Sequence, residues 1–322
     1  MNLSIILPVY NVEPYLDSCL KSIFNMNFNF ELIAINDGST DGSLPILRKY
    51  ESENKNMKVI DQENSGPSVA RNVGLEEAIG NYVYYFDSDD ILLKKFEIIN
   101  FMSEMRSFDI LTFNAEVFDT GKTNNIQNKQ RYIEPLKLFN NFKKEILNDF
   151  EYINYNGLDY LTMICKKEAY TPVVWRKIYR KSFLEEYNIN FHPNIAPGED
   201  DLHFFQTLLC NPNVAHFDQI VLSHRIRSTS IMGYKDKGRN YRSYNLVLSE
   251  LIQLKKKHLE SSLISKNINW IINVFFRRVY SQNPTLKEAK RIFHMAKKYH
   301  ISLNLKTRLK LSLSVFKGKT NE

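Results

Sequence analysis

Three aspartates stand close together directly after a run of apolar and aromatic residues. The run YVYYF covers residues 82–86, and Asp87, Asp89 and Asp90 follow it, with Ser88 between the first two. Carboxylates crowded where a strand leaves the core repel one another, so a positive group is expected among them. Carboxylate oxygens are the ligands that Mg²⁺ and Mn²⁺ prefer, and these ions commonly hold phosphates. The spacing therefore predicts a divalent-metal site that also binds a phosphorylated ligand.

A structural explanation of the same stretch is that one aspartate caps a helix beginning near Ile91 while the others are solvated. One carboxylate is enough for a cap. The presence of three therefore favours the metal site over the cap.

The residues before this cluster alternate between strand-like and helix-like patterns. Short apolar runs rich in β-branched and aromatic residues are separated by segments with apolar residues at helical spacing. The predicted strands cover residues 3–8, 30–36, 57–61 and 82–86, and the predicted helices cover residues 15–26, 43–53 and 66–79. This alternation is typical of a parallel sheet with helices on both faces. Right-handed crossovers would place the carboxyl ends of all four strands at one edge.

Polar or turn-forming residues follow three of these strands, and ligands bind at this edge in open α/β sheets. The residues are Pro8 with Tyr10, Asp37 with Gly38, and Asp87 with its neighbours. The sequence has no G-x-G-x-x-G after the first strand and no G-x-x-x-x-G-K-[ST] motif, which argues against a dinucleotide fold and a P-loop.

The remaining pattern is less regular. We expect a strand at residues 108–118, a polar loop at 119–130, a helix led by acidic residues at 199–205, and one or two strands at 214–227. Residues 131–170 show no clean period. From about residue 243 the pattern predicts helices to the end of the sequence.

Composition excludes several classes of protein. The chain has 322 residues, of which 43% are hydrophobic, and this is ample for a large core. No apolar run approaches the roughly 20 residues needed to span a bilayer, and the first residues lack the pattern of a signal peptide. The three scattered cysteines form neither a disulfide nor a zinc pattern. A reducing, cytoplasmic location is therefore expected.

The net charge of +7 is concentrated towards the C-terminus. From residue 251 onward there are 16 lysine and arginine residues against 3 acidic ones, so the preceding part is mildly acidic. A basic amphipathic tail could lie on an anionic membrane, and a helix packed on the body with a solvated lysine face is the equal alternative. No motif for nucleic-acid binding accompanies the tail, and no nucleic-acid partner is expected.

Six segments of the chain together resemble the family 2 glycosyltransferases, which are inverting enzymes of the GT-A fold. They are LSIILPVYNVEPYLDSCLKSI, FELIAINDGSTDGS, ENSGPSVARNVGLEEAIGNYVYYFDSDD, VWRKIYRKSFL, PGEDDLHFF and HRIRSTSIM. They occur in the family's order and spacing, and residues 119–170 and those after about 234 fall outside the resemblance. The resemblance is to family members of the bacterial surface-polysaccharide or lipooligosaccharide type.

The resemblance implies an α/β fold with a Rossmann-like mixed sheet and a helical C-terminal extension. Residues 1–234 would form the GT-A domain, with a nucleotide-sugar-binding half at 1–118 and an acceptor half at 119–234. Residues 235–322 would form a basic helical region.

The resemblance also implies roles for residues on the donor side. Pro8 and Tyr10 would border the nucleotide base, and Asp37 would accept a hydrogen bond from the imide N–H of uracil. An Asx turn before Gly38 is a compatible alternative for Asp37. Arg71 would lie beside the base or the phosphates, and its alternative is an exposed helical arginine.

The acidic cluster matches the family's Asp-x-Asp motif. Asp87 and Ser88 would belong to the nucleotide-sugar site, and Asp89 would bind the Mn²⁺ or Mg²⁺ ion that bridges the diphosphate. Asp90 would orient the loop or cap the following helix. His224 would be a third metal ligand or a phosphate contact, and a structural role is its alternative.

Asp200 matches the catalytic base of the family, with Glu199 as the rival base. The implied reaction is a single displacement in which the base takes a proton from an acceptor hydroxyl and that oxygen attacks the anomeric carbon. Asp201 is expected to face solvent or to cap the helix.

Four further residues are predicted to contact the acceptor or the phosphates: Trp175, Lys177, Arg225 and Arg227. Trp175 could stack on a sugar or lie in the core. Arg225 and Arg227 alternate along a predicted strand, so only one of them would face the site.

The predicted function is metal-assisted transfer from a UDP-sugar to a hydroxyl of a growing glycan, either capsule, O-antigen, lipooligosaccharide or another lipid-linked saccharide. The enzyme would be cytoplasmic, with peripheral binding to the inner face of the membrane as one option. The alternative is a catalytically silent membrane-peripheral scaffold, which would be expected to have lost some of Asp37, Asp87, Asp89 and Asp200. All four are present. A nucleotidyltransferase is disfavoured because no early glycine-rich stretch with a catalytic lysine or arginine is found.

Overall fold

A computed structural model describes residues 3–93, 107–119, 143–147, 150–167, 172–226, 237–257 and 262–281, and residues 294, 297, 298 and 301. The chain divides into two compact units. The first contains Met1–Pro193 and His203–Gly233, and the second contains Asn194–Leu202 and Tyr234–Glu322. Within the described ranges, ten strands of the first unit form one sheet in the order β3-β2-β1-β4-β9-β6-β10-β8-β7, with β5 paired to β10.

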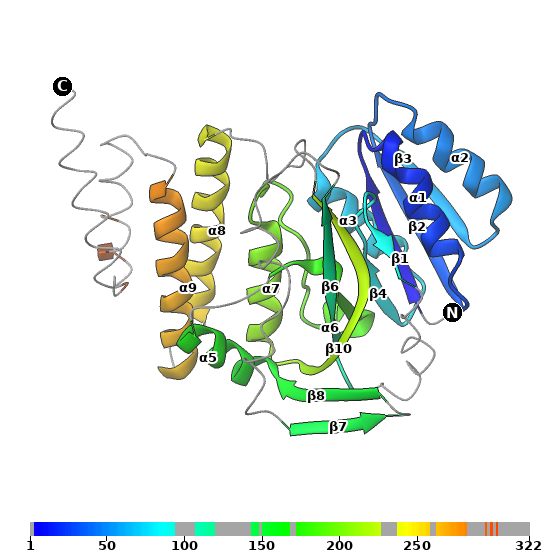
Figure 1. The fold of residues 1–322 in the computed structure, drawn as a ribbon. Coiled ribbons are helices and arrows are strands. Elements are labelled where there is room, and N and C mark those ends of the chain that lie inside the picture. Colours follow the sequence, from blue (N-terminus) through cyan, green and yellow to red (C-terminus); the bar gives the residue numbers. More distant parts are fainter. Residues whose placement is uncertain are drawn as a thin grey trace. The chain divides into compact units, whose positions relative to one another are not determined.

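Four parallel strands and three helices form the N-terminal part of the first unit (Figure 1). The strands are β1 (Leu3–Val9), β2 (Phe30–Asp37), β3 (Met57–Gln62) and β4 (Tyr82–Tyr85), and the helices are α1 (Glu13–Phe24), α2 (Ser43–Glu53) and α3 (Pro67–Glu77). All seven elements lie within a few residues of their predicted bounds. The predicted parallel arrangement is therefore confirmed.

The side chains of β1 alternate between the two faces of the sheet. Leu3, Ile5 and Leu7 belong to a buried cluster with apolar residues of α1 and α2. Ile6 points the other way, towards α3, where a Cβ built on Gly74 would lie 2.3 Å from Cγ2 of Ile6. Helices therefore cover both faces, as predicted, and glycine at position 74 lets α3 approach the sheet closely.

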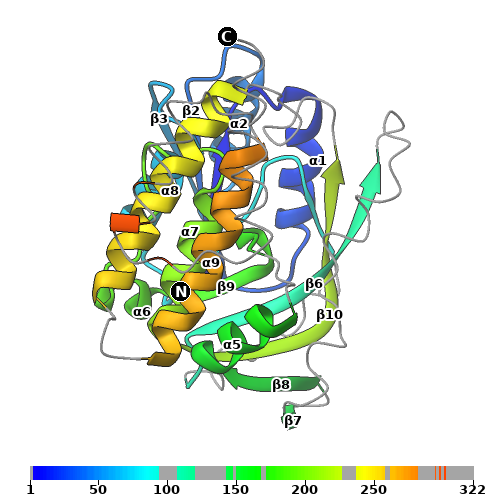
Figure 2. The same cartoon turned by 90° about the vertical axis from the view of Figure 1, so that its left-hand side faces the viewer.

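The second half of the sheet is mixed in direction. β9 (Lys177–Arg180) runs antiparallel between β4 and β6 (Ile110–Asp119), and β10 (Asn213–Ile226) runs parallel to β6. Beyond β10 lie β8 (Phe150–Asn156) and β7 (Lys143–Leu147), each antiparallel to its neighbour (Figure 2). The predicted mixed sheet is confirmed.

The expected helix does not begin at Ile91 itself. Ile91–Leu92 is the short strand β5, which pairs antiparallel with Leu222 and Ser223 of β10, about 130 residues away in the sequence. The backbone N–H of Leu93 also donates to the carbonyl of Val221 at 2.8 Å. The prediction of a helix after these residues falls on positions 94–106, which lie outside the described residues.

The described helices of the remaining chain are α5 (Gly157–Lys167), the 3₁₀ turn η3 (Val174–Arg176), α6 (Lys181–Glu186), α7 (Glu199–Leu209), α8 (Lys237–Lys257) and α9 (Ser262–Ser281). In the second unit α8 and α9 run side by side (Figures 1 and 2). The predicted apolar face of α9 is buried, because Ile268, Ile272 and Phe276 are completely covered. The predicted basic tail after residue 303 lies outside the described residues. No helix among the described residues is long and apolar enough to cross a membrane.

Candidate active site

The loop after β4 brings three carboxylates to the carboxyl edge of the sheet. The N–H of Phe86 donates to the carbonyl of Ile6 at 2.9 Å, which continues the strand pairing by one residue. The N–H of Asp90 then donates to the carbonyl of Asp87 at 3.1 Å and closes a turn. Asp89 is buried and Asp90 is completely covered. The turn therefore concentrates negative charge in a place with little water.

Asp90 and His224 form a buried pair at the centre of this site. Nδ1 of His224 lies 2.9 Å from Oδ2 of Asp90. Burial raises the pKa of Asp90 to about 7, against the opposing effect of His224. Burial alone would lower the pKa of His224, but the charge and hydrogen bond of Asp90, together with the charges of Asp87 and Asp89, raise that pKa above its usual value. The two groups therefore form a hydrogen-bonded pair in which each pKa lies above its ordinary value.

Asp87 joins this pair to make a candidate metal site. One atom from each of Asp87, Asp90 and His224 lies within 4.8 Å of the other two. Two carboxylates and an imidazole suit a divalent ion such as Mn²⁺. A cation at this point would also offset the repulsion that Asp87 and Asp89 exert on Asp90. The residues therefore fit a divalent metal.

Asp89, the expected metal ligand, is not a member of this three-residue cluster. Its backbone carbonyl accepts a hydrogen bond from Nε of Arg225 at 2.8 Å. The expected ligand His224 is in the cluster. A ligand role for Asp89 stays a prediction, and so does a place for Asp87 in the nucleotide-sugar site.

Trp175 supports the imidazole of His224 from η3. The two rings are parallel to within 11°, with centroids 4.4 Å apart. Trp175 is only 3% exposed, so its indole ring is buried. Of the two roles predicted for Trp175, this agrees with a place in the core. Its backbone carbonyl accepts from the hydroxyl of Tyr84 at 2.8 Å, which connects η3 to β4.

Arg71 is not the exposed helical arginine of the structural alternative, because it is only 6% exposed. Its Nη2 lies 3.3 Å from Oδ1 of Asp87. The guanidinium also stands over the ring of Phe191, 5.0 Å from the centroid. Asn72 holds this segment in place, since its side chain bonds to both the N–H and the carbonyl of Phe191. The structure thus brings Arg71 to the acidic loop.

Asp37 organises the approach to α3 from the end of β2. Oδ1 accepts from the N–H of Ser65 and the amide of Gln62, and Oδ2 accepts from the N–H of Gly66, each at 2.8 Å. Among the described residues these bonds cross to the segment between β3 and α3, and an Asx turn at Gly38 is not among them. Tyr10 is 49% exposed, which leaves its ring accessible beside this edge.

The predicted contact of Pro8, Tyr10 and Asp37 with a base remains a prediction. Pro8 is partly exposed at the penultimate position of β1, and Ser88 is 5% exposed in the acidic loop.

The three acids of the PGEDD segment occupy the first turn of α7, and this turn is part of the Asn194–Leu202 segment of the second unit. Glu199 and Asp200 are half-buried. Asp201 is buried and pairs with Arg278 of α9 at 2.7 Å, so the expectation that it faces solvent was wrong. Asp201 therefore has a structural role as the partner of Arg278.

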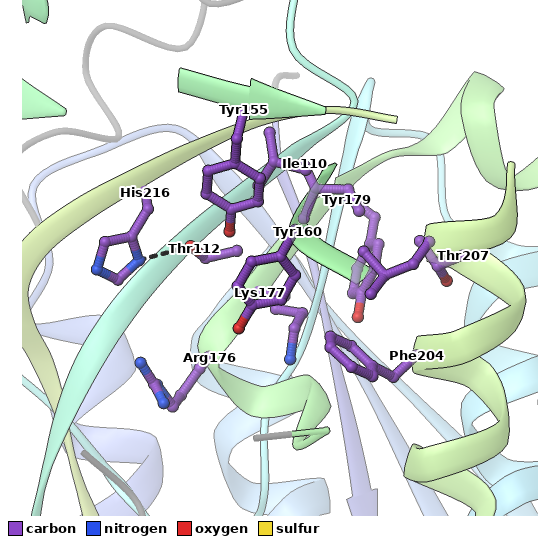
Figure 3. A pocket seen from close by; sticks show the side chains of 12 residues that line it. Ile110, Thr112, Tyr155, Tyr160, Arg176, Lys177, Tyr179, Phe204, Thr207 and His216 are labelled. Atoms are coloured by element: carbon purple, nitrogen blue, oxygen red, sulfur yellow. Dashed lines mark hydrogen bonds between the residues drawn. The ribbon is translucent and has the colours of Figure 1, made fainter. Parts of the chain in front are cut away.

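Lys177 lines a small, partly open cavity (Figure 3). The cavity has a volume of about 20 Å³, and its lining includes Thr112, Tyr155, Tyr160, Lys177, Phe204 and His216. This volume holds about one water molecule. Nζ of Lys177 donates to the carbonyl of Val173 at 2.5 Å and stands 4.9 Å from the centre of the Phe204 ring. The cavity is too small for a sugar, and a contact between Lys177 and the acceptor stays a prediction.

Two features of the site escaped the sequence analysis. Asp90 was given only a role in the loop, although a third acid directly after the Asp-x-Asp motif was a usable signal. Phe191 was not considered, and no local pattern marks it.

Of the two arginines predicted to contact the phosphates, Arg225 contacts the acidic loop, and Arg227 lies outside the described residues.

Comparison with known sequences identifies a family for the first unit. The family model described as "Glycosyl transferase family 2" matches residues 4–170, about half of the chain. The "Putative glycosyltransferase EpsH" of Bacillus subtilis (strain 168) is 29% identical over 234 residues, which cover 71% of this chain and 62% of EpsH. The poly(ribitol-phosphate) beta-glucosyltransferase of Bacillus spizizenii is 26% identical over 295 residues, covering 89% of this chain and 42% of that protein. The chain thus spans less than two thirds of either relative.

Solved structures agree in fold. TarS residues 1–349 of S. aureus, in complex with UDP-GlcNAc, matches with a TM-score of 0.62 and 23% sequence identity, covering 98% of this chain and 79% of that chain. The match confirms the predicted GT-A fold. The family match over residues 4–170, on a sheet of this topology, shows that the chain belongs to glycosyl transferase family 2.

Proposed function

We propose that the protein is a metal-assisted, inverting glycosyltransferase that moves a sugar from a UDP-sugar to a hydroxyl of a growing surface glycan. The observation that carries this proposal is the cluster of Asp87, Asp90 and His224 at the carboxyl edge of the sheet in a family 2 chain. The names of similar proteins support it, since one is a poly(ribitol-phosphate) beta-glucosyltransferase and another binds UDP-GlcNAc.

The donor would bind along the carboxyl edge from β2 to the acidic loop. The exposed ring of Tyr10 offers a stacking surface for the base, and Asp37 would accept the imide N–H of uracil. Arg71, held between Asp87 and Phe191, would place a positive charge near the phosphates. This arrangement favours UDP over nucleotides whose base lacks an imide N–H.

Asp200 would act as the general base, with Glu199 as the alternative. It takes the proton of the acceptor hydroxyl, and the oxygen forms a bond to the anomeric carbon as the bond to the diphosphate breaks. Because the nucleophile and the leaving group occupy opposite faces, the configuration inverts without a covalent enzyme intermediate. When bound, a divalent ion would supply charge neutralisation for the departing UDP.

The acceptor would be a surface glycan or a lipid-linked saccharide of the capsule, O-antigen or lipooligosaccharide type. The excess of basic residues from position 251 onward supports binding at an anionic membrane face. We infer a cytoplasmic enzyme that acts peripherally on such a membrane.

A thermal-shift screen of UDP-, GDP- and CMP-sugars, with and without Mn²⁺, tests the proposal. A ligand that binds the folded state raises the melting temperature by mass action, so one UDP-sugar should give a shift that needs Mn²⁺. The shift should be lost in Asp90→Asn and retained in Asp159→Asn, which changes an exposed aspartate of α5. Asp89→Asn, assayed in the same way, decides whether that residue is also a ligand.

The screen is followed by a transfer assay with the UDP-sugar that shifts. Release of UDP that depends on added glycan acceptor supports the transferase. A protein that gives no shift with any nucleotide sugar would contradict the enzyme and favour the catalytically silent scaffold.

A further inference from the structure

We propose that Arg225 is a positioning residue that preforms the metal-binding loop, and that it does not hold the donor diphosphate. The proposal rests on the metal site proposed above. Arg225 follows His224 near the end of β10, at the opposite end of that strand from the residues that pair with β8.

Arg225 contacts two consecutive residues of the acidic loop through two different groups. Its backbone N–H donates to Oδ1 of Asp90 at 2.8 Å, and its side-chain Nε donates to the carbonyl of Asp89 at 2.8 Å. The first bond fixes a carboxylate, and the second fixes the peptide plane that joins Asp89 to Asp90. One residue thus determines both the course of the loop and the direction of the buried acid.

The guanidinium of Arg225 itself contacts two aromatic rings. Its Cζ lies 4.8 Å from the ring centroid of Tyr15 in α1 and 4.4 Å from that of Phe118 in β6. Cation–π contacts with these two rings restrict the orientation of the planar group, whose Nε donates to the loop. A lysine would keep the charge but would lose both the planar stacking and the directed Nε bond.

These contacts matter because the loop would otherwise be pushed apart by its own charges. With its Oδ1 bound to the N–H of Arg225, Asp90 presents Oδ2 to Nδ1 of His224. The positions of two of the three candidate ligands therefore depend on the junction between β10 and the loop. Groups of this kind, which orient metal ligands without binding the metal, typically change metal affinity by roughly 10–100-fold when removed.

The test compares Arg225→Lys with wild-type protein by titration with Mn²⁺ in the absence of nucleotide, following free Mn²⁺ by electron paramagnetic resonance. The variant should bind Mn²⁺ about tenfold more weakly. Arg180→Lys is the matched control. Arg180 is also a partly buried arginine that bonds a carboxylate, Asp109, but it pairs with Tyr82 at the amino end of β4. The Arg180→Lys protein should bind Mn²⁺ as tightly as the wild type does.

A second titration, with UDP in the presence of EDTA, separates positioning from direct phosphate binding. A positioning role predicts that Arg225→Lys leaves metal-free UDP binding unchanged. Normal Mn²⁺ affinity in the variant would overturn the proposal, and so would weaker UDP binding without metal. If the wild type binds no Mn²⁺, the metal site itself fails and the positioning role fails with it.

Tyr15→Leu provides a second variant in case Arg225→Lys does not fold, as judged by circular dichroism. It removes one of the two rings that orient the guanidinium and leaves the arginine in place. It should weaken Mn²⁺ binding in the same direction by a smaller factor. Unchanged Mn²⁺ affinity in a folded Tyr15→Leu protein would contradict the proposal.

Discussion

The indole ring of Trp175 lies flat against the imidazole of His224, 4.4 Å away between centroids and tilted by 11°. Trp175 comes from the turn before β9, whereas His224 comes from the end of β10. Asp90 holds the same imidazole at Nδ1. The stacking on Trp175 fixes the plane of the His224 ring, and the contact with Asp90 fixes the direction of Nδ1. This is the arrangement expected for a preorganised metal ligand.

Removing this stack should weaken metal binding. We expect Trp175→Leu to lower Mn²⁺ affinity by roughly tenfold, because the imidazole loses the surface that fixes its plane, whereas Trp175→Phe should retain most of the affinity. Isothermal titration with Mn²⁺ measures both. Equal affinities in the leucine variant and the wild type would show that Asp90 alone orients His224.

Changing the proposed base should stop transfer without affecting the donor. Asp200→Asn should lower kcat by roughly 10²–10⁴-fold, since the amide cannot accept the proton of the acceptor hydroxyl, while the Kd for the UDP-sugar stays near the wild-type value. Glu199→Gln, one residue away in the same helical turn, is the control. If Glu199→Gln shows the larger loss of kcat, the two roles must be exchanged.

The buried histidine of α7 should make stability depend on pH. His203 is 1% exposed and stacks on Phe191 with ring centroids 4.3 Å apart. Among the described residues neither of its ring nitrogens has a hydrogen-bond partner. Burial lowers the pKa of His203 to about 3, and the charges of Arg71 and Lys177 add to this effect.

Because the folded pKa of His203 is below the unfolded value of roughly 6.5, the unfolded chain takes up the proton first as the pH falls. Stability is therefore full above that value and declines towards pH 3. Lowering the pH from 7 to 5 should reduce the free energy of unfolding by about 2 kcal/mol through His203 alone. His203→Phe should reduce the decline by that amount in urea unfolding, whereas His294→Asn, at an exposed histidine, should not. Parallel declines in all three proteins would contradict a neutral, buried His203.

The close approach of α3 to β1 should make position 74 intolerant of a side chain. Gly74→Ala would place a methyl group 2.3 Å from Cγ2 of Ile6 and should lower the free energy of unfolding by about 1–3 kcal/mol, despite the higher helix propensity of alanine. Ile6→Ala removes the clashing atom. In that background Gly74→Ala should be neutral or stabilising in urea unfolding, and an equal loss in both backgrounds would place the strain elsewhere.

Local sequence patterns were sufficient for the N-terminal half of the fold. Strand β1 (Leu3–Val9) is predicted from a run of apolar residues, and helix α2 (Ser43–Glu53) is predicted from apolar residues at helical spacing. Both patterns depend on nearby residues alone. The family resemblance added the mixed sheet. The short strand at Ile91–Leu92 was missed because two residues carry no period, and the strand exists only through its pairing with β10.

The candidate site could be predicted only in part, because local sequence patterns show some of its residues and not the contacts between distant ones. Asp87 was singled out because the acids are adjacent in sequence. The pairing of Asp90 with His224 joins residues 134 positions apart, and that of Asp201 with Arg278 joins residues 77 apart. No spacing rule reports such contacts. The burial of Arg71 likewise follows from Asp87 and Phe191, which reach it from separate parts of the chain.

The two ends of β10 have different partners, and this has a consequence for how the protein can change in evolution. Its first residues, Asn213–Phe217, pair with β8, whereas Leu222 and Ser223 pair with β5 and Arg225 reaches the acidic loop. The residues of β6 that pair with Phe217 and Arg225 are Phe113 and Phe118, five steps apart, so at about 3.3 Å per step roughly 17 Å separate these regions. Insertions and exchanges around β7 and β8 can therefore accumulate at the outer edge of the sheet without altering the residues proposed to bind the donor. We expect related chains to diverge at this edge while they keep the acidic loop and its partners on β10.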